Sequence, residues 1–430
     1  MRDIFLMTVF AGLMAWGLRK HHVLLMVWVW LSLMNPHRLT FSFAYDFPFA
    51  YISALAILLV FPFSKERHAF PKSTPSTFLI LFYVWVGVTS LASFNTPADV
   101  FEMWLKVTKI QLILFIMLTM LMGRKQIDIL IWVIAISIGF FGFKGGIFTI
   151  SSGGSSMVMG PSGSFIESTN HIALAMVMVV PLMYYLAKTN TNQFVRFGLY
   201  AAMALTTLSV FGTTSRGALL AVCAMVAFLG IKSGRAFTTT AIAAIVLVGL
   251  ASIMSDQWLD KMGTISTHED HSAQSRLYTW KMIWNMVLDH PLTGGGFQVT
   301  ENPMTWQVYA VTEWLRAYSP HSIYFQALAE HGFVGLFLYL GIGISAYRLA
   351  GSVASRAKAM TQDWAVLLMG MVQASLVGFA VGGAFVNLVN FDLPYYFVAL
   401  VILVDQVIRA MDGKGAAVPS QNGPLVASGS

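Results

Sequence analysis

The sequence contains very few charged residues: 10% of its 430 positions are Asp, Glu, Lys or Arg, whereas 57% are hydrophobic. A soluble domain carries about a quarter charged residues, so this composition excludes an ordinary water-soluble protein. With a mean hydropathy of +0.70, the chain is predicted to be an all-α polytopic membrane protein. Its net charge of +7 belongs to short loops between apolar runs, which indicates membrane topology and no nucleic-acid surface.

Cysteine is nearly absent as well. The single Cys223 lies inside an apolar run, which excludes an intrachain disulfide and a cysteine-based metal site. The first residues lack a basic segment followed by a small-residue cleavage site, so no cleavable signal peptide is expected. No inverted internal repeat is visible, which argues against a transporter without excluding one.

Apolar runs dominate what is present. A spanning helix needs about twenty mostly apolar residues, and candidates lie at 3–18, 22–36, 49–63, 76–93, 103–122, 126–148, 170–187, 195–213, 216–232, 237–254, 322–348, 363–385 and 391–409. The first three are short, so about twelve true spans are expected. The organisation predicted is a bundle at 1–254, a large polar and partly helical excursion at 255–321, helices at 322–412 and a tail at 413–430 with the composition of disorder.

Basic residues occur at every second connection between these runs. They lie at 64–72, 124–125, 188–196, 232–235 and 348–358, and near 409 and 414. By the positive-inside rule these loops face the cytoplasm. The 255–321 excursion then lies on the periplasmic or extracellular face, and we interpret it as a lid over a site in the membrane. The basic stretch 19–22 would also face inside, which requires an outside N-terminus if the first segment spans.

Basic residues on the outer face are exceptions to the positive-inside rule, and we therefore treat them as candidate functional residues. Arg216 begins the run 216–232, Lys144 lies near the outer end of its span, Arg276 begins an amphipathic stretch, and His321 stands where the chain re-enters the membrane. Each alone could equally snorkel to headgroups or lie on a solvated helix face. Together the cations indicate a diphosphate clamp, because guanidinium forks match phosphate oxygens.

A local pattern singles out His321. Ser319, Pro320 and His321 have the residue types of N-cap, N1 and N2 of the following helix. The positive end of the helix dipole would disfavour the imidazolium, and a neutral ring can accept a proton as a general base. The alternative, an interfacial histidine bonded to a loop carbonyl, is equally open.

The remaining polar residues point to structural roles. His268 and His271, with Glu269 and Asp270 between them, could bind a metal, but such a run is more often a solvated loop. On a straight helix His331 would lie about 15 Å beyond His321, and Glu330 is expected to be a buried acid paired with a helix neighbour. Asp289-His290-Pro291 and Gly294 to Gly296 predict a helix end and a turn; they follow no strand, so no nucleotide-binding loop is predicted.

Short motifs, taken in order, resemble the O-antigen ligase/polymerase superfamily. They are Thr214-Ser215-Arg216-Gly217, Arg276 with Trp280, Asp289 to Leu292, Gly294 to Gly296, and His321-Ser322 followed by Glu330, Gly332 and Gly335. Within it the chain looks most like bacterial O-antigen ligases, including exosortase-associated O-glycosylation ligases, whose Lys-Gly-Gly-Ile-Phe stretch resembles 144–148. The resemblance is carried by 140–350, and the N-terminal third matches only in hydropathy.

The resemblance implies a GT-C-like glycosyltransferase in the bacterial inner membrane, with 255–321 as its periplasmic catalytic loop. It implies transfer of a glycan from undecaprenyl diphosphate to a lipid A–core hydroxyl, with His321 as base and Arg216 and Arg276 binding the diphosphate. Lys144 is not assigned by the resemblance, although its location suits a phosphate contact. A single attack on the sugar predicts inversion of the anomeric centre.

No cofactor is expected, because the lipid diphosphate is already an activated leaving group. No metal is expected either, since arginines can replace a divalent cation and no Asp-x-Asp cluster occurs on the outer face. Two related functions remain open, an O-antigen polymerase and a ligase with a protein acceptor. A flippase for lipid-linked oligosaccharides is an alternative of another class, which would place charges along the bundle interior.

Overall fold

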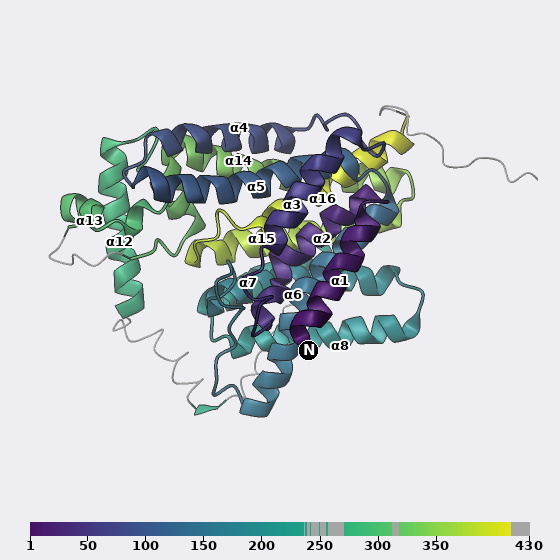
Figure 1. The fold of residues 1–430 in the computed structure, drawn as a ribbon. Coiled ribbons are helices and arrows are strands. Elements are labelled where there is room, and N and C mark those ends of the chain that lie inside the picture. Colours follow the sequence, from purple (N-terminus) through teal and green to yellow (C-terminus); the bar gives the residue numbers. More distant parts are fainter. Residues whose placement is uncertain are drawn as a thin grey trace, which may run out of the picture.

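The computed structural model describes residues 1–235, 271–311 and 318–413, with a few separate positions between 237 and 256. Within this part every regular element is helical (Figure 1), which confirms the all-α class. The α-helices are α1 (Arg2–Gly17), α2 (His21–Met34), α3 (Phe49–Val60), α4 (Thr74–Leu91), α5 (Pro97–Met120), α6 (Arg124–Ser152), α7 (Thr169–Thr189), α8 (Gln193–Gly212), α9 (Arg216–Lys232), α12 (His271–Asp289), α13 (Pro303–Tyr309), α14 (Ile323–Ala359), α15 (Asp363–Gly382) and α16 (Asp392–Met411). The 3-10 helices are η1 (Pro36–Leu39), η2 (Phe61–Phe63), η3 (Val299–Glu301) and η4 (Gly383–Phe385).

Eight of the described helices are long and apolar enough to cross a membrane. They are α4, α5, α6, α7, α8, α14, α15 continued by η4, and α16. The apolar α2 and α3 are shorter, and α9 has 17 residues with the bounds expected from the sequence. The chain is therefore a polytopic membrane protein. The number of twelve spans stays a prediction, and the run 237–254 falls almost wholly outside the described residues.

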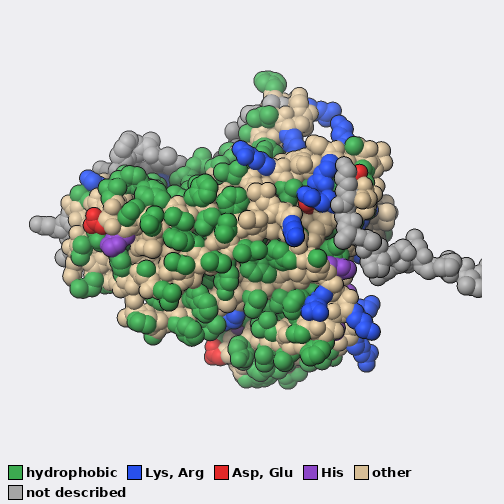
Figure 2. Space-filling model, turned by 90° about the horizontal axis from the view of Figure 1, so that it is seen from above, with side chains coloured by type: hydrophobic (Ala, Val, Ile, Leu, Met, Phe, Trp, Pro, Cys, Tyr) green, Lys and Arg blue, Asp and Glu red, His purple; other side chains and the backbone are tan. Residues whose placement is uncertain are grey.

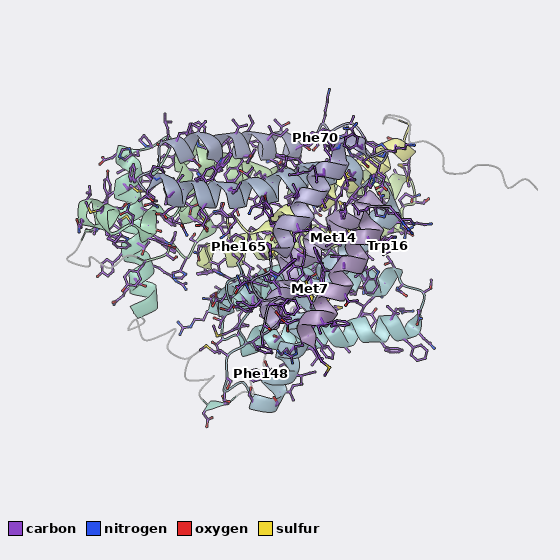
Figure 3. The ribbon with its side chains drawn as sticks, in the orientation of Figure 1. Met7, Met14, Trp16, Phe70, Phe148 and Phe165 are labelled. Carbon is purple, nitrogen blue, oxygen red and sulfur yellow. The ribbon has the colours of Figure 1, made fainter. Side chains whose placement is uncertain are left out.

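Large apolar side chains cover much of the molecular surface. Figure 2 shows hydrophobic side chains across the visible face, with Lys and Arg gathered toward one end. Trp16 and Phe148, labelled in Figure 3, are 52% and 43% exposed. Extensive apolar surface marks contact with a partner or a membrane, and on helices of this length the surrounding phase is lipid.

Several of the basic connections predicted for one side of the membrane lie together. Contacts link 18–22 to 64–72, 64–72 to 119–124, 119–124 to 356–364, and 356–364 to the last part of α16. The contacts are His22 Nδ1 with Glu66 (3.0 Å), His68 N donating to Thr119 O (2.8 Å), Arg124 over the Trp364 ring (4.9 Å) and Arg356 with Asp405.

The other connections meet at the opposite end. The contacts there are Phe94 N donating to Gly295 O (2.9 Å), Asn95 Nδ2 donating to Phe297 O (2.7 Å), Val158 N donating to Gly212 O (3.2 Å), and His171 Nε2 with Asn387 Oδ1 (3.1 Å). In Figure 1, α12 runs across the ends of α4 and α5 at this end. The compartment that each end faces stays a prediction.

The helix predicted as one straight span from 322 is sharply broken. Gly332 has φ 67° and ψ −170°, a backbone region that is essentially limited to glycine. A Cβ added to Gly335 would lie 2.1 Å from the Cβ of His331, whereas residues four apart on a straight helix have Cβ atoms about 5–6 Å apart. The straight geometry behind the expected depth of His331 therefore does not apply.

The break leaves backbone groups without helical partners, and the glycine-rich turn after α12 bonds to them. Its bonds are Gly295 N to Ala329 O (2.9 Å), Gly296 N to Glu330 O (3.1 Å) and Phe333 N to Pro291 O (2.9 Å). Ala329, Glu330 and Gly332 are buried, and buried backbone groups need such partners because water cannot reach them. The turn that the sequence predicts from Pro291 and the three glycines is present, and its function is to dock α12 onto the break in α14.

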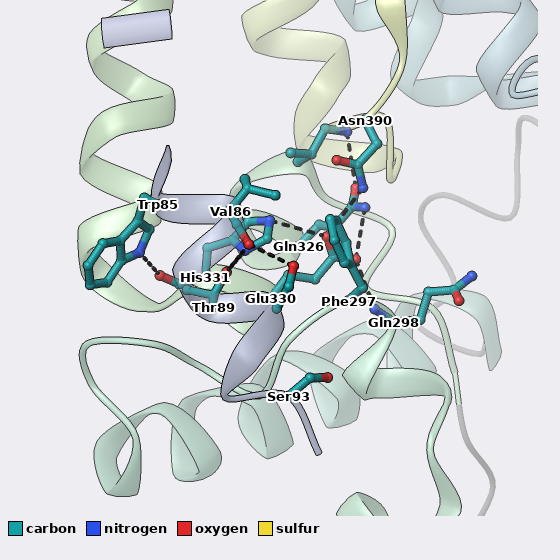
Figure 4. A network of polar contacts seen from close by, with 12 residues as sticks. Trp85, Val86, Thr89, Ser93, Phe297, Gln298, Gln326, Glu330, His331 and Asn390 are labelled. Carbon is teal, nitrogen blue, oxygen red and sulfur yellow. Dashed lines mark hydrogen bonds and ion pairs between the residues drawn. The ribbon is translucent and has the colours of Figure 1, made fainter. Parts of the chain in front are cut away.

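Side chains complete this junction (Figure 4). Trp85 Nε1 donates to His331 O (2.9 Å), and Thr89 Oγ1 lies 2.8 Å from His331 Nδ1. Glu330 is buried, as expected, and accepts from its helix neighbour Gln326 (3.2 Å). It also accepts from Gln298 N (3.3 Å) and Asn390 Nδ2 (3.4 Å). Glu330 thus joins α14 to Gln298, after α12, and to Asn390, just before α16. These contacts favour a structural role for Glu330.

Candidate active site

The amphipathic α12 is fixed at the point where the chain enters α14. Trp280 donates from Nε1 to Pro320 O (2.8 Å) and stacks on Phe325 with ring centroids 4.8 Å apart and planes 4° apart. Arg276 lies one helical turn before Trp280, on the same face of the helix. The Trp280 contacts therefore turn Arg276 toward residues 318–322.

His321 does not occupy the helical position that its sequence context suggests. It has φ 46°, and the N-cap is Ser322, whose Oγ accepts from Phe325 N. The expected register of Ser319 as cap and Pro320 as N1 is wrong by three residues, because Ser322 is equally able to cap and the Pro320 carbonyl is taken by Trp280. His321 precedes the helix and follows residues 318–320, which have no regular secondary structure.

The surroundings of His321 keep its ring neutral. Its pKa is lowered from 6.5 to about 4, first by burial of the ring, then by the positive charge of Arg276 and by His171. At neutral pH the ring is therefore an available proton acceptor. The sequence predicted a neutral ring because of the helix dipole. In the structure the main causes are desolvation of the ring and the neighbouring cation, Arg276.

His171 is a site residue that the sequence reasoning missed. It lies in the first turn of α7, with Nδ1 3.0 Å from Phe165 O and Nε2 3.1 Å from Asn387 Oδ1. Asn387 also donates to Ser319 Oγ (3.3 Å), two residues before His321. A histidine in the first turn of an outer helix end, the pattern used for His321, was the available signal. Asn387 had none, because its partners lie far away in the sequence.

Arg216 reaches the same end of the molecule from α9. Ser215 caps this helix by accepting from Ala218 N (3.3 Å), so Arg216 is the first helical residue. The adjacent Gly217 packs against η4, where an added Cβ would lie 2.8 Å from the Cβ of Phe385. Only glycine permits this approach.

The short helix η4 connects Arg216 with the entrance to α14. A Cβ on Gly383 would lie 2.4 Å from Ile323 Cδ1, and Ile323 is two residues after His321. Arg216 and His321 therefore flank the same short segment. Both arginines are half-buried, a setting in which charge–phosphate contacts are screened less than on an open surface.

Lys144 lies on α6, which packs against α8. It is exposed on α6, while Gly142 and Gly145 on the same helix pack on Thr206 and Ser209 of α8. Figure 3 shows Phe148, one turn from Lys144, at the lower edge of the molecule and away from Phe165, which neighbours His171. The sequence analysis did not consider a second lysine, Lys106 of α5. Its Nζ lies 5.8 Å from the centre of the Phe165 ring.

The arrangement can hold an anion and accept a proton. The charge of Arg276 acts on a neutral imidazole, that of His321, and Arg216 begins α9 at the same end of the membrane helices. In the part of the chain that the structure describes, no three His, Cys, Asp or Glu side chains gather in a metal-binding group. His268, Glu269 and Asp270 fall outside the described residues, as does the side chain of His271.

Comparison with known families separates the chain into two parts. Residues 201–340 match the O-antigen ligase family, and residues 1–191 match a family of unknown function. The first match contains Arg216, Arg276 and His321, whereas Lys144 and His171 lie in the second. No curated protein matches the chain.

Proposed function

We propose that this chain, which matches the O-antigen ligase family over residues 201–340, transfers a glycan from undecaprenyl diphosphate to a lipid A–core hydroxyl. The observation that carries the proposal is the half-buried, neutral His321, on which the charge of Arg276 acts. That pair combines a proton acceptor with a phosphate-binding group within the family-matched segment.

In the proposed reaction Arg216 and Arg276 hold the diphosphate of the donor. Charge that builds on the departing diphosphate is stabilised by these preorganised donors. His321 takes the proton of the acceptor hydroxyl as its oxygen attacks the anomeric carbon. The bond from that carbon to the diphosphate breaks, and the sugar is inverted because one displacement occurs.

The diphosphate also changes the base itself. Negative charge close to an imidazole favours the protonated form and raises its pKa, by about 1–3 pH units for a near neighbour. A bound donor therefore opposes the effect of Arg276, and His321 becomes a stronger base when the donor is in place.

The sidedness of the reaction follows from the distribution of basic loops. The end that carries 18–22, 64–72 and 356–364 is assigned to the cytoplasm by the positive-inside rule. The end with α12 and His321 then faces the periplasm. In a bacterial inner membrane, donor and acceptor would meet there.

The test is transfer by the purified protein in nanodiscs, with defined undecaprenyl-diphosphate glycan and lipid A–core. The expected product is glycosylated lipid A–core, formed equally with and without EDTA because the arginines supply the positive charge. Lengthening of the glycan on the lipid diphosphate would identify a polymerase, and glycan on an added protein would identify a protein ligase. Donor that crosses a bilayer without forming product would identify a flippase.

A further inference from the structure

The helix α12 has two apolar faces. One of them packs against the first turns of α14 and is fully buried, and it consists of Met282, Ile283, Met286 and Val287. The opposite face carries Leu277, Trp284 and Leu288, which are 62%, 47% and 58% exposed. Their spacing places these three side chains in one line along the helix. We call this line the α12 stripe, and the contacts of α12 with the other described residues leave it largely exposed.

The α12 stripe joins the apolar surface of α14. The rings of Trp284 and Phe333 meet edge to face, with centroids 6.0 Å apart. Phe333 is 40% exposed, and Phe337, one turn further along α14, is 65% exposed. Because α14 is long and apolar enough to cross the membrane, its exposed apolar side chains face lipid. The stripe therefore continues a surface that is already in contact with lipid.

The length of α14 gives the depth at which the two surfaces meet. Phe333 follows the break at Gly332, and Arg356, paired with Asp405, lies among the basic connections at the other end. At the helical rise of about 1.5 Å per residue, Phe333 and Arg356 are about 35 Å apart, whereas the hydrocarbon core is about 30 Å thick. Phe333 and its neighbour Trp284 therefore lie at the boundary of the hydrocarbon core, the depth at which Trp is enriched in membrane proteins.

The direction of α12 agrees with this depth. Figure 1 shows α12 lying crosswise to α4 and α5, over their ends, so its axis follows the plane of the membrane. Lys281 is exposed on the same line, between Leu277 and Trp284, and its long stem lets the ammonium group reach lipid phosphates. A helix in the membrane interface combines Trp and Leu side chains with basic residues that face the headgroups.

We propose that the α12 stripe is a membrane-binding surface: Leu277, Trp284 and Leu288 insert at the boundary between headgroups and acyl chains, and Lys281 contacts lipid phosphate. Lipid fits the stripe better than a second protein, because the stripe runs without a break into the lipid-facing side of α14. This surface does not depend on the proposed reaction. It would, however, hold Arg276, the residue before Leu277, at the depth of lipid phosphate groups.

Spin labels on single cysteines test this surface in nanodiscs of phosphatidylcholine and phosphatidylglycerol, in a Cys223→Ser background. The labels are placed at Leu277→Cys and Leu288→Cys on the stripe. Phe337→Cys on the lipid-facing side of α14 and Gln307→Cys, an exposed polar position on α13, are the two references. Molecular oxygen, which concentrates in lipid, and a water-soluble nickel chelate are compared as relaxing agents.

Both stripe labels should be relaxed more by oxygen than by the nickel chelate, as at Phe337→Cys, because the stripe is inserted in lipid. The label at Gln307→Cys should show the reverse order. If the label at Leu277→Cys or at Leu288→Cys follows Gln307→Cys, the stripe faces water and the inference is overturned.

A variant of the stripe provides a second measurement. Leu277→Gln combined with Leu288→Gln should expose a label at Lys281→Cys to the nickel chelate, because the polar side chains no longer hold α12 in the interface. Phe194→Gln combined with Phe197→Gln removes two exposed apolar side chains from α8 and should leave that label unchanged. The same nickel accessibility in both double variants would contradict the membrane-binding role of the stripe.

Discussion

The pKa of His321 is lowered by burial of its ring, by the positive charge of Arg276 and by a second histidine, His171. Burial and these neighbours give a base that is neutral at rest, and Asn387 connects His171 to the segment just before His321. In the proposed reaction, proton acceptance and anion binding are therefore coupled, since an anion that enters the site would alter the proton affinity of His321. Two predictions follow from the sign of that coupling.

The first concerns pH. For the empty enzyme, kcat/KM should rise through an ionisation near pH 4, the lowered pKa of His321, and stay level above it because the ring is then neutral. For the donor complex, kcat should rise at a higher pH, because the diphosphate raises the pKa. His321→Gln should lower kcat about 10²–10⁴-fold, the usual contribution of a general base. In this variant neither kcat/KM nor kcat should show the rise with pH. An unchanged profile in His321→Gln would leave His321 only a positioning role.

The second concerns Arg276. Arg276→Gln removes the positive charge, so the pKa of His321 should rise toward, but not reach, 6.5, since burial still acts. Arg276→Lys keeps the charge and should keep the pKa low, yet transfer should fall because a point charge cannot replace the guanidinium fork. The pKa can be measured without turnover, from the pH dependence of His321 modification by diethyl pyrocarbonate. A pKa that moves equally in both variants would contradict the assignment.

Among the helices, α14 has the most demanding geometry. The glycine turn at 291–296 is hydrogen-bonded to the break at Gly332. The break therefore also helps to fix the position of α12 and Arg276. Hydrogen bonds from Gly295 and Gly296 and from Trp85 replace those that the break removes. The break is thus stabilised by specific hydrogen bonds, and its backbone conformation should be essential for stability and for the position of α12.

Gly332→Ala tests this joint. A Cβ there would lie 2.1 Å from Leu292 O, and the backbone conformation alone costs about 1–3 kcal/mol for a residue other than glycine. The melting temperature in detergent should therefore fall clearly, and transfer should fall with it. Gly343→Ala, on the same helix with open space at its Cβ, should leave the melting temperature unchanged. Equal stability of the two variants would show that the chain adapts at 332.

Over the whole chain, two groups of connections lie at opposite ends of the bundle, and their sidedness can be tested by labelling. In a Cys223→Ser background, Gln307→Cys on α13 should react with a membrane-impermeant maleimide in intact spheroplasts. Lys65→Cys should react only after the membrane is opened. Both positions are exposed, so accessibility differs only by compartment. The reverse result would overturn the periplasmic assignment.

The sequence predicts most of the described helices, whereas the roles of the candidate site residues stay predictions. Hydropathy locates a span because it sums many residues, which is why α9 begins at Arg216 and ends at Lys232 as expected. It contains no information on backbone direction, so the break at Gly332 and the left-handed His321 were not predicted. His171 and Asn387 are 216 positions apart, and no local pattern connects them.

That long-range contact has a consequence for biosynthesis. The site draws on α7, α9, α12 and the start of α14, and also on Asn387, which lies just before the last helix. A ribosome must therefore translate, and the insertion machinery must place, nearly the entire chain before the parts meet. Partly made chains would carry the arginines but not the finished site, so under the proposed function a nascent protein would not consume lipid-linked sugar before its assembly is complete.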